Sequence, residues 1–191
     1  GITGKSSDIR GGAVTFRLTN DAGGRFLIDA NSGVVTVRDA TLLSFESATS
    51  HPITVEASDG NLASTADFTI AVTNVAPSVP TDSDAVANTV AENAANGSAV
   101  GITASASDVH GGTVTFSLTN DAGGRFQIDP ATGIVTVKDT TTLDYEAATS
   151  HSITVQASDG NLTSQASFTI AVSNVAPSAP VDGDVTATSV S

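Results

Sequence analysis

Carboxylates are the most frequent charged side chains in this sequence. The 191 residues contain 20 Asp and Glu against 7 Lys and Arg, which gives a formal net charge of −13 at pH 7. So few basic side chains could not neutralise a run of phosphates, which excludes nucleic acid, and an anionic membrane surface is disfavoured for the same reason. Cations are the natural partners of such a chain, and Ca²⁺ best suits carboxylate and carbonyl oxygens.

Two short acidic segments occupy matching places in a long internal repeat. Residues 143–146 read Leu-Asp-Tyr-Glu, and residues 43–46 read Leu-Ser-Phe-Glu. The match extends far beyond them, because about 55 of the 80 aligned positions are identical between residues 1–80 and 101–180. Identity over such a length indicates tandem domains rather than a solenoid of small units. Within the two segments, the aspartate is the charged residue that is not kept.

Catalytic arrangements are not expected. His51 and His151 each follow a serine, but adjacent residues of a strand point to opposite faces and cannot form a nucleophile and base pair. Paired carboxylates could hydrolyse glycosides only beside a cleft, and no cleft-forming insertion interrupts the repeat. The sequence has no cysteine, which excludes disulfides, thiolate metal sites and a thiol nucleophile. We therefore expect a protein that is not an enzyme.

Short alternating runs, separated by turn signals, fill each repeat. Val114, Phe116 and Leu118 alternate with threonine and serine, which is the period of a half-buried strand. Asp159-Gly160 between two such runs is typical of a hairpin turn. The complete repeat is expected to contain seven strands, near residues 86–91, 99–107, 113–119, 125–129, 133–138, 151–158 and 164–173. The predicted fold class is all-β, with two tandem seven-stranded Greek-key β-sandwiches.

The repeats do not coincide with the ends of the sequence. Residues 81–100 have no counterpart before residue 1, so the first sandwich is expected to lack its N-terminal strand. Residues 181–191 resemble residues 81–91, and we expect the sequence to be a segment of a longer array. The predicted parts are repeat 1 (1–76), a linker with prolines and aspartates (77–84), repeat 2 (85–176), and a linker with the start of a third repeat (177–191). Prolines in such a linker favour a stiff, extended path.

Five motifs, in order and spacing, resemble those of cadherin repeats, in the bacterial cadherin-like form found in large repetitive surface adhesins. They are Ala-Glu-Asn with Glu92, Ala-Ser-Asp with Asp108, Phe-Gln-Ile-Asp-Pro-Ala-Thr-Gly at 126–133, Leu-Asp-Tyr-Glu at 143–146 and Val-Gln-Ala-Ser-Asp-Gly at 155–160. The resemblance implies a cadherin- or immunoglobulin-like sandwich and an extracellular, cell-surface location. It also implies that Ca²⁺ is the cofactor and that carboxylates hold it at domain junctions.

By the same resemblance, the carboxylates fall into two sets of metal ligands. The set for the junction between the two repeats is Glu46, Asp108 and Asp159, with Asp82 or Asp84 from the linker. The set for a junction after repeat 2 is Glu92, Asp144 and Glu146.

Several positions depart from the family pattern. The linker reads Ser-Asn-Val-Ala-Pro-Ser and keeps at most Asn74 or Asn174 as a ligand, and Arg10 and His110 stand where the second aspartate of Asp-x-Asp is usual. Ser44 replaces an aspartate as well. The first junction is therefore expected to bind calcium weakly, and the second more strongly.

These observations predict an extender or stalk segment of a secreted surface adhesin that serves cell adhesion or biofilm formation. Its partners would be neighbouring repeats of the same chain. Two alternatives stay open, a polysaccharide-binding module and homophilic self-association by strand exchange. The second follows from the open sheet edge of repeat 1 and the matching strand within residues 181–191.

Overall fold

The computed structural model describes residues 1–9 and 11–181 and contains strands with three short 3₁₀ turns. Its residues fall into two compact units. Unit 1 comprises Gly1–Ser78 together with two loops of the second sequence repeat, Ser107–Val114 and Asp159–Leu162. Unit 2 comprises Val79–Ala106, Thr115–Ser158 and the chain from Thr163 onward. Within the described residues, no helix is long and apolar enough to cross a membrane.

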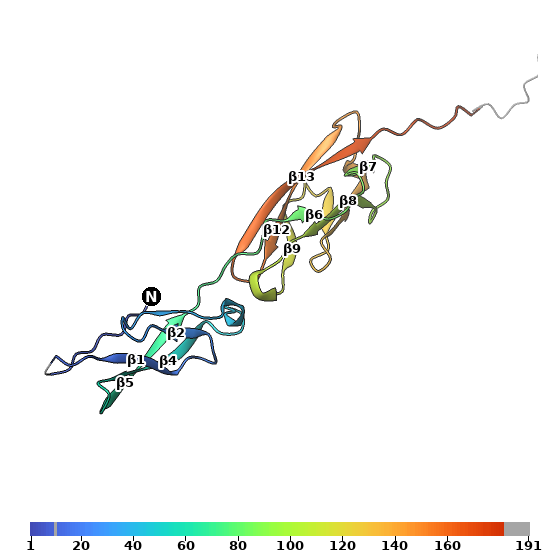
Figure 1. Cartoon of the computed structure of the whole chain (residues 1–191). Coiled ribbons are helices and arrows are strands. Elements are labelled where there is room, and N and C mark those ends of the chain that lie inside the picture. Colours follow the sequence, from blue (N-terminus) through green and yellow to red (C-terminus); the bar gives the residue numbers. More distant parts are fainter. Residues whose placement is uncertain (10, 182–191) are drawn as a thin grey trace, which may run out of the picture. The chain divides into compact units, whose positions relative to one another are not determined.

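Unit 2 contains two four-stranded sheets (Figure 1). In the first sheet the order is β7 (Thr89–Ala91), β13 (Thr163–Ser173), β12 (Ser150–Ser158) and β9 (Thr115–Asn120). In the second the order is β10 (Phe126–Ile128), β11 (Ile134–Val137), β8 (Ala99–Ser105) and β6 (Thr81–Asp82). β7 lies parallel to β13, and the other pairs are antiparallel. All seven predicted strands are present, and β6 adds a short strand that the sequence pattern did not indicate.

Unit 1 repeats part of this arrangement. Its larger sheet has the order β1 (Thr15–Asn20), β4 (Ser50–Ser58) and β5 (Ala63–Ala71), and β2 (Phe26–Ile28) pairs with β3 (Val35–Val37). Thr3 forms an isolated bridge with Val34, where β8 pairs with β11 in unit 2. No described strand of unit 1 corresponds to β7, as expected from the sequence.

The alternating pattern determines which side chains fill each core. On β12, Ile153, Val155 and Ala157 are fully buried, while the residues between them reach the surface. β4 repeats the pattern with Ile53 and Val55. Each such valine or isoleucine contributes about 1.5–3 kcal/mol through removal of apolar surface from water. The all-β sandwich therefore follows from the period-two placement of small and branched apolar residues.

Two matching turns place the acidic segments at the ends of the sandwiches. The 3₁₀ turns η1 (Ala40–Leu42) and η3 (Thr140–Thr142) are capped by Asp39 and Asp139, whose side chains accept hydrogen bonds from the N–H groups two residues later. The leucine that follows η3, Leu143, is buried, and its counterpart Leu43 packs against the core of unit 1. Because this leucine closes the core, the carboxylates just after it face outward.

Candidate functional site

The described residues contain two groups of three carboxylates. One group is Glu46, Asp108 and Asp159, and the other is Glu92, Asp144 and Glu146. In each group the three ligand atoms lie within 4.8 Å of one another. Anionic oxygens this close repel one another, and a bound cation removes that repulsion. We call them group 1 and group 2. Six of the eight residues predicted as metal ligands lie in these groups.

Group 1 lies within unit 1, and hydrogen bonds hold Asp159 in place. One oxygen of Asp159 accepts the backbone N–H groups of Asn161 (2.7 Å) and Leu162 (2.6 Å), and the other accepts the Asn74 side-chain amide (2.9 Å). The N–H groups of Leu162 and Asn161 are the main reason that the pKa of Asp159 lies below its usual value. Asp159 is therefore a fixed anion at neutral pH.

Asp108 supplies the second carboxylate of group 1, and one of its oxygens has no partner. The residue precedes a 3₁₀ turn, η2 (Val109–Gly111), and its side chain does not cap that turn. Its Oδ2 is buried and accepts no hydrogen bond within the described part of the chain. A buried carboxylate oxygen without a donor is costly. A cation would satisfy this oxygen, so the residues of group 1 fit a hard metal ion such as Ca²⁺.

Glu46 is the exposed member of group 1, and Ser44 orients it. The Ser44 hydroxyl donates to Glu46 Oε2 (3.0 Å) and accepts the N–H of Ser47 (3.2 Å). A cavity of about 250 Å³ adjoins the group, and its lining includes the polar residues Glu46, Asp108 and Asn74 and the apolar residues Leu43 and Phe45. The serine that replaces the expected aspartate thus keeps the glutamate positioned without adding a fourth charge.

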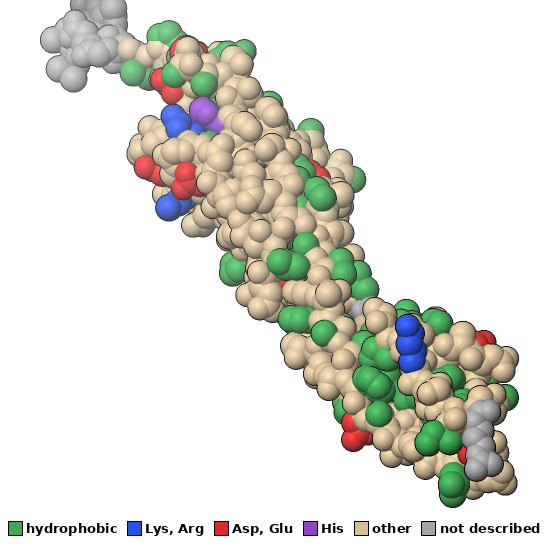
Figure 2. All heavy atoms as spheres, turned by 90° about the vertical axis from the view of Figure 1, so that its left-hand side faces the viewer, with side chains coloured by type: hydrophobic (Ala, Val, Ile, Leu, Met, Phe, Trp, Pro, Cys, Tyr) green, Lys and Arg blue, Asp and Glu red, His purple; other side chains and the backbone are tan. Residues whose placement is uncertain are grey.

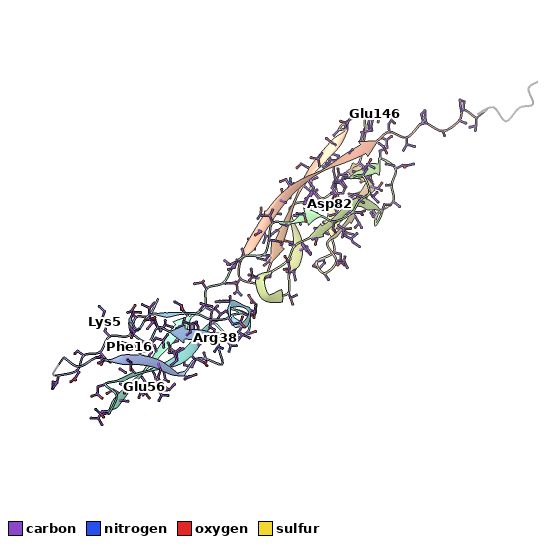
Figure 3. The ribbon with its side chains drawn as sticks, in the orientation of Figure 1. Lys5, Phe16, Arg38, Glu56, Asp82 and Glu146 are labelled. Carbon is purple, nitrogen blue, oxygen red and sulfur yellow. The ribbon has the colours of Figure 1, made fainter. Side chains whose placement is uncertain are left out.

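Group 2 lies within unit 2, and its most buried member is already engaged. Glu92 Oε2 accepts the N–H of Tyr145 (3.0 Å), and Oε1 accepts the N–H of Val175 (2.6 Å). Glu92 therefore joins three segments, namely the end of β7, the acidic loop and the chain after β13. Asp144 accepts the N–H of Ala147 (3.0 Å), and Glu146 is exposed at one end of the unit (Figure 3).

Asp82 and Asp84 lie outside both groups. Asp82 Oδ1 accepts the backbone N–H groups of Thr103 (3.1 Å) and Asp84 (3.0 Å), which fixes β6 beside β8. Asp84 Oδ1 accepts the N–H of Val86 (2.9 Å). Figure 3 shows Asp82 in the middle of unit 2, away from Glu146. The two linker aspartates were predicted as metal ligands, but in the structure both side chains accept hydrogen bonds from backbone N–H groups.

The serine and histidine of each Ser-His pair are adjacent residues of a strand and point to opposite faces of it. His51 is buried and faces Phe26, with 6.3 Å between ring centroids, while Ser50 is exposed on the other face of β4. His151 faces Phe126 in the same tilted arrangement, with 6.2 Å between ring centroids. The Nε2 atoms of both histidines are buried and have no hydrogen-bond partner among the described residues. The two histidines are core residues, and neither can act on the serine before it.

Comparison with known proteins shows a similarity to cadherins. Residues 87–173 match the cadherin domain family. This part of the chain is similar to a cadherin domain. The chain is 33% identical over 189 residues to human protocadherin Fat 1, a match that covers 92% of the chain and 4% of that protein. It is also 33% identical over 163 residues to chicken cadherin-related family member 1, with 81% and 18% covered. The chain thus spans less than a fifth of either relative.

Solved cadherin structures share the fold. Extracellular cadherin domains 3–6 of protocadherin gamma B2 match with a TM-score of 0.50 at 24% identity, covering 88% of this chain and 42% of that one. Domains 1–4 of Drosophila N-cadherin match with a TM-score of 0.50 at 22% identity, covering 92% and 44%. Cadherin domains are extracellular adhesion modules without enzymatic activity and generally bind Ca²⁺ at domain junctions.

Proposed function

We propose that this chain is an extender segment of a repetitive surface adhesin of the bacterial type, stiffened by Ca²⁺ at the carboxylate groups. The observation that supports this most strongly is the buried, unpartnered Asp108 Oδ2 next to the anionic Asp159. An oxygen in that position has no stabilising partner until a cation arrives. The absence of cysteine fits the same role, since metal ions would then supply the rigidity that disulfides supply elsewhere.

In the proposed mechanism, bound Ca²⁺ links the segments that supply the group 1 carboxylates, and the link is lost when the ion is removed. Glu46 belongs to the first sequence repeat, whereas Asp108 and Asp159 belong to loops of the second. A Ca²⁺ ion bound by all three would tie segments far apart in the sequence, and without the ion their charges would drive these segments apart. Ca²⁺ takes six to eight oxygens, so backbone carbonyls and water must complete its shell. Extracellular calcium is abundant enough to fill a site of modest affinity.

The polysaccharide-binding alternative has no supporting surface. Glycan sites usually present exposed aromatic rings, and no phenylalanine is among the exposed large apolar residues in the described ranges. Tyr145 is half-buried, and its backbone is held by Glu92. The extender function is the better supported of the two.

Calcium titration on the whole 191-residue chain tests the proposal. Isothermal calorimetry on the wild type should detect binding, and the Glu46→Ala, Asp108→Ala double variant should lose the part that group 1 contributes. The same titration with Mg²⁺ is the control, because Mg²⁺ demands a compact octahedral shell that these spread carboxylates do not favour. Unchanged calcium binding in the double variant would contradict the assignment of group 1.

A further inference from the structure

Each sequence repeat contains one arginine whose guanidinium group binds backbone carbonyls and no carboxylate. These arginines belong to residues 20–26 and 120–126, which have the identical sequence Asn-Asp-Ala-Gly-Gly-Arg-Phe. Acidic side chains far outnumber basic ones, and Lys and Arg are sparse on the face drawn in Figure 2, so carboxylates are available as partners. Within the described residues, however, the ion pair that forms is the one between Arg17 and Glu56.

Arg125 joins the turn that contains it to the acidic loop of group 2. Its Nε donates to the carbonyl of Thr142 (3.0 Å), the last residue of η3, and its Nη1 donates to the carbonyl of Ala122 (2.5 Å). Carbonyls at the end of such a turn lack partners within the turn, and a basic side chain can satisfy them. Thr142 stands two residues before Asp144, so the guanidinium fixes the backbone from which that carboxylate extends.

The first repeat has the same connection. Arg25 Nε donates to the carbonyl of Leu42 (2.8 Å), and its Nη1 donates to the carbonyl of Ala22 (2.7 Å). Because the acceptor is a backbone carbonyl, the contact does not depend on whether leucine or, as in Thr142, threonine stands there. Leu42 lies four residues before Glu46, the member of group 1 that the first repeat supplies. The arginine contact therefore precedes both acidic loops.

The turn that contains the arginine adopts a conformation that makes room for this contact. Ala122 has a φ of 59°, in the left-handed region that residues with a Cβ atom rarely adopt, and Ala22 has the same conformation at 57°. A Cβ atom on Gly123 would lie 3.1 Å from Nη1 of Arg125, which is tighter than an ordinary contact. The turn thus leaves space for the guanidinium and presents the Ala122 carbonyl to it.

We propose that Arg125 is a positioning residue that holds the acidic loop of group 2 ready for a cation, and that Arg25 does the same for Glu46 in group 1. This role rests on the proposed calcium function. Charge-assisted hydrogen bonds are strong, and the rigid fork of a guanidinium can hold two carbonyls at once, which the single ammonium of lysine does less well. A loop that is already in place loses less conformational freedom when the ion binds.

The sign of the effect separates positioning from charge. The positive charge of Arg125 by itself opposes the binding of Ca²⁺ nearby. If the charge alone mattered, Arg125→Met would bind calcium more tightly than the wild type, and Arg125→Lys would bind it equally well. A positioning role predicts that both variants bind calcium more weakly at group 2. The expected loss is about 10–100-fold, the usual effect of removing a group that orients metal ligands.

Calcium titration of the whole 191-residue chain tests this role, with the fluorescence of Tyr145, between Asp144 and Glu146, as the readout for group 2. Lys138→Met is the matched control, because Lys138 is the other basic side chain of unit 2, is exposed, and forms no ion pair among the described residues. We expect the control to bind calcium like the wild type. Arg125→Met that binds as tightly as the wild type, or more tightly, would overturn the proposal.

Hydrogen exchange in chelator separates a failure of this proposal from a failure of the calcium function. The N–H groups of Tyr145 and Ala147 donate to two carboxylates of group 2 and report whether the acidic loop is in place. Both should exchange faster in Arg125→Met than in Lys138→Met, while the amides of β12 keep their rates. Unchanged loop exchange, or faster exchange throughout β12, would contradict a local positioning role. Faster loop exchange in a chain whose wild type ignores calcium would contradict the calcium function and support the positioning of the loop.

Discussion

Replacing Asp108 by asparagine should remove the calcium response of unit 1. Three carboxylates supply only part of the six to eight oxygens that Ca²⁺ takes, so the site belongs with extracellular modules whose dissociation constants are about 10⁻⁴–10⁻³ M. With a dissociation constant of about 0.1 mM, about 1 mM free calcium stabilises the folded unit by about 1.4 kcal/mol. For a domain of this size, that free energy raises the melting temperature by roughly 5–10 °C. Asp108→Asn keeps the size of the side chain and should lose most of this shift.

Thermal unfolding followed by circular dichroism, in calcium and in chelator, measures the shift. Asp8→Asn is the matched control, because Asp8 holds the same place in the first repeat, its Oδ2 accepts the N–H of Gly12 (3.2 Å), and it lies in neither carboxylate group. The control should respond to calcium like the wild type. Equal melting temperatures of the wild type in calcium and in chelator would refute the reasoning. An undiminished calcium shift in Asp108→Asn would refute the role of the unpartnered oxygen.

Three more predictions concern the remaining carboxylates and a core histidine. Ser44→Asp should tighten calcium binding, measured by calorimetry, and lower the melting temperature in chelator, because it adds a fourth anion near Glu46. Tyr145 is the only tyrosine in the sequence and there is no tryptophan, so a change in tyrosine fluorescence on adding calcium should report binding at group 2. Glu92 accepts the N–H of Tyr145, and Glu92→Gln should make that fluorescence change smaller. Burial, with the charge of Arg125 second, lowers the pKa of His151. The folded state then binds fewer protons than the unfolded state, so the stability that the neutral His151 contributes is fully present above pH 6.5 and is lost as the pH drops below it. In His151→Leu, the free energy of unfolding measured against pH should lack this part of the loss in acid.

The strands could be predicted from the sequence because their signal is local. Alternation along β12 is visible in the sequence and alone decides that Ile153 and Val155 face the core. β6 could not be predicted in this way, since two residues next to a proline show no period. Its place depends on Asp82 accepting the N–H of Thr103, which lies 21 residues further along the chain. Pairing between distant segments is what the local pattern does not contain.

The carboxylate groups could be predicted as sets, but not how their oxygens are used. The resemblance to cadherin repeats placed Glu46 with Asp108 and Asp159, and the structure brings the three together. Nothing in the sequence distinguishes Asp108, whose buried oxygen is free, from Asp82, whose oxygen holds backbone. Asp82 lies in the short strand β6 and Asp108 lies in the loop after β8, and the two side chains have the same charge. The difference arises from which N–H groups happen to lie within reach once the strands are paired.

The serine at position 44 can now be explained by charge. Group 1 already has three carboxylates without it, and two of them, Asp108 and Asp159, come from loops of the second sequence repeat. An aspartate at 44 would add a fourth anion where one buried oxygen already lacks a partner. Group 2, as far as the described residues extend, consists of Glu92, Asp144 and Glu146, and Glu92 is held by two backbone N–H groups. The Ser44 hydroxyl therefore orients Glu46 (3.0 Å) without adding a fourth negative charge to group 1.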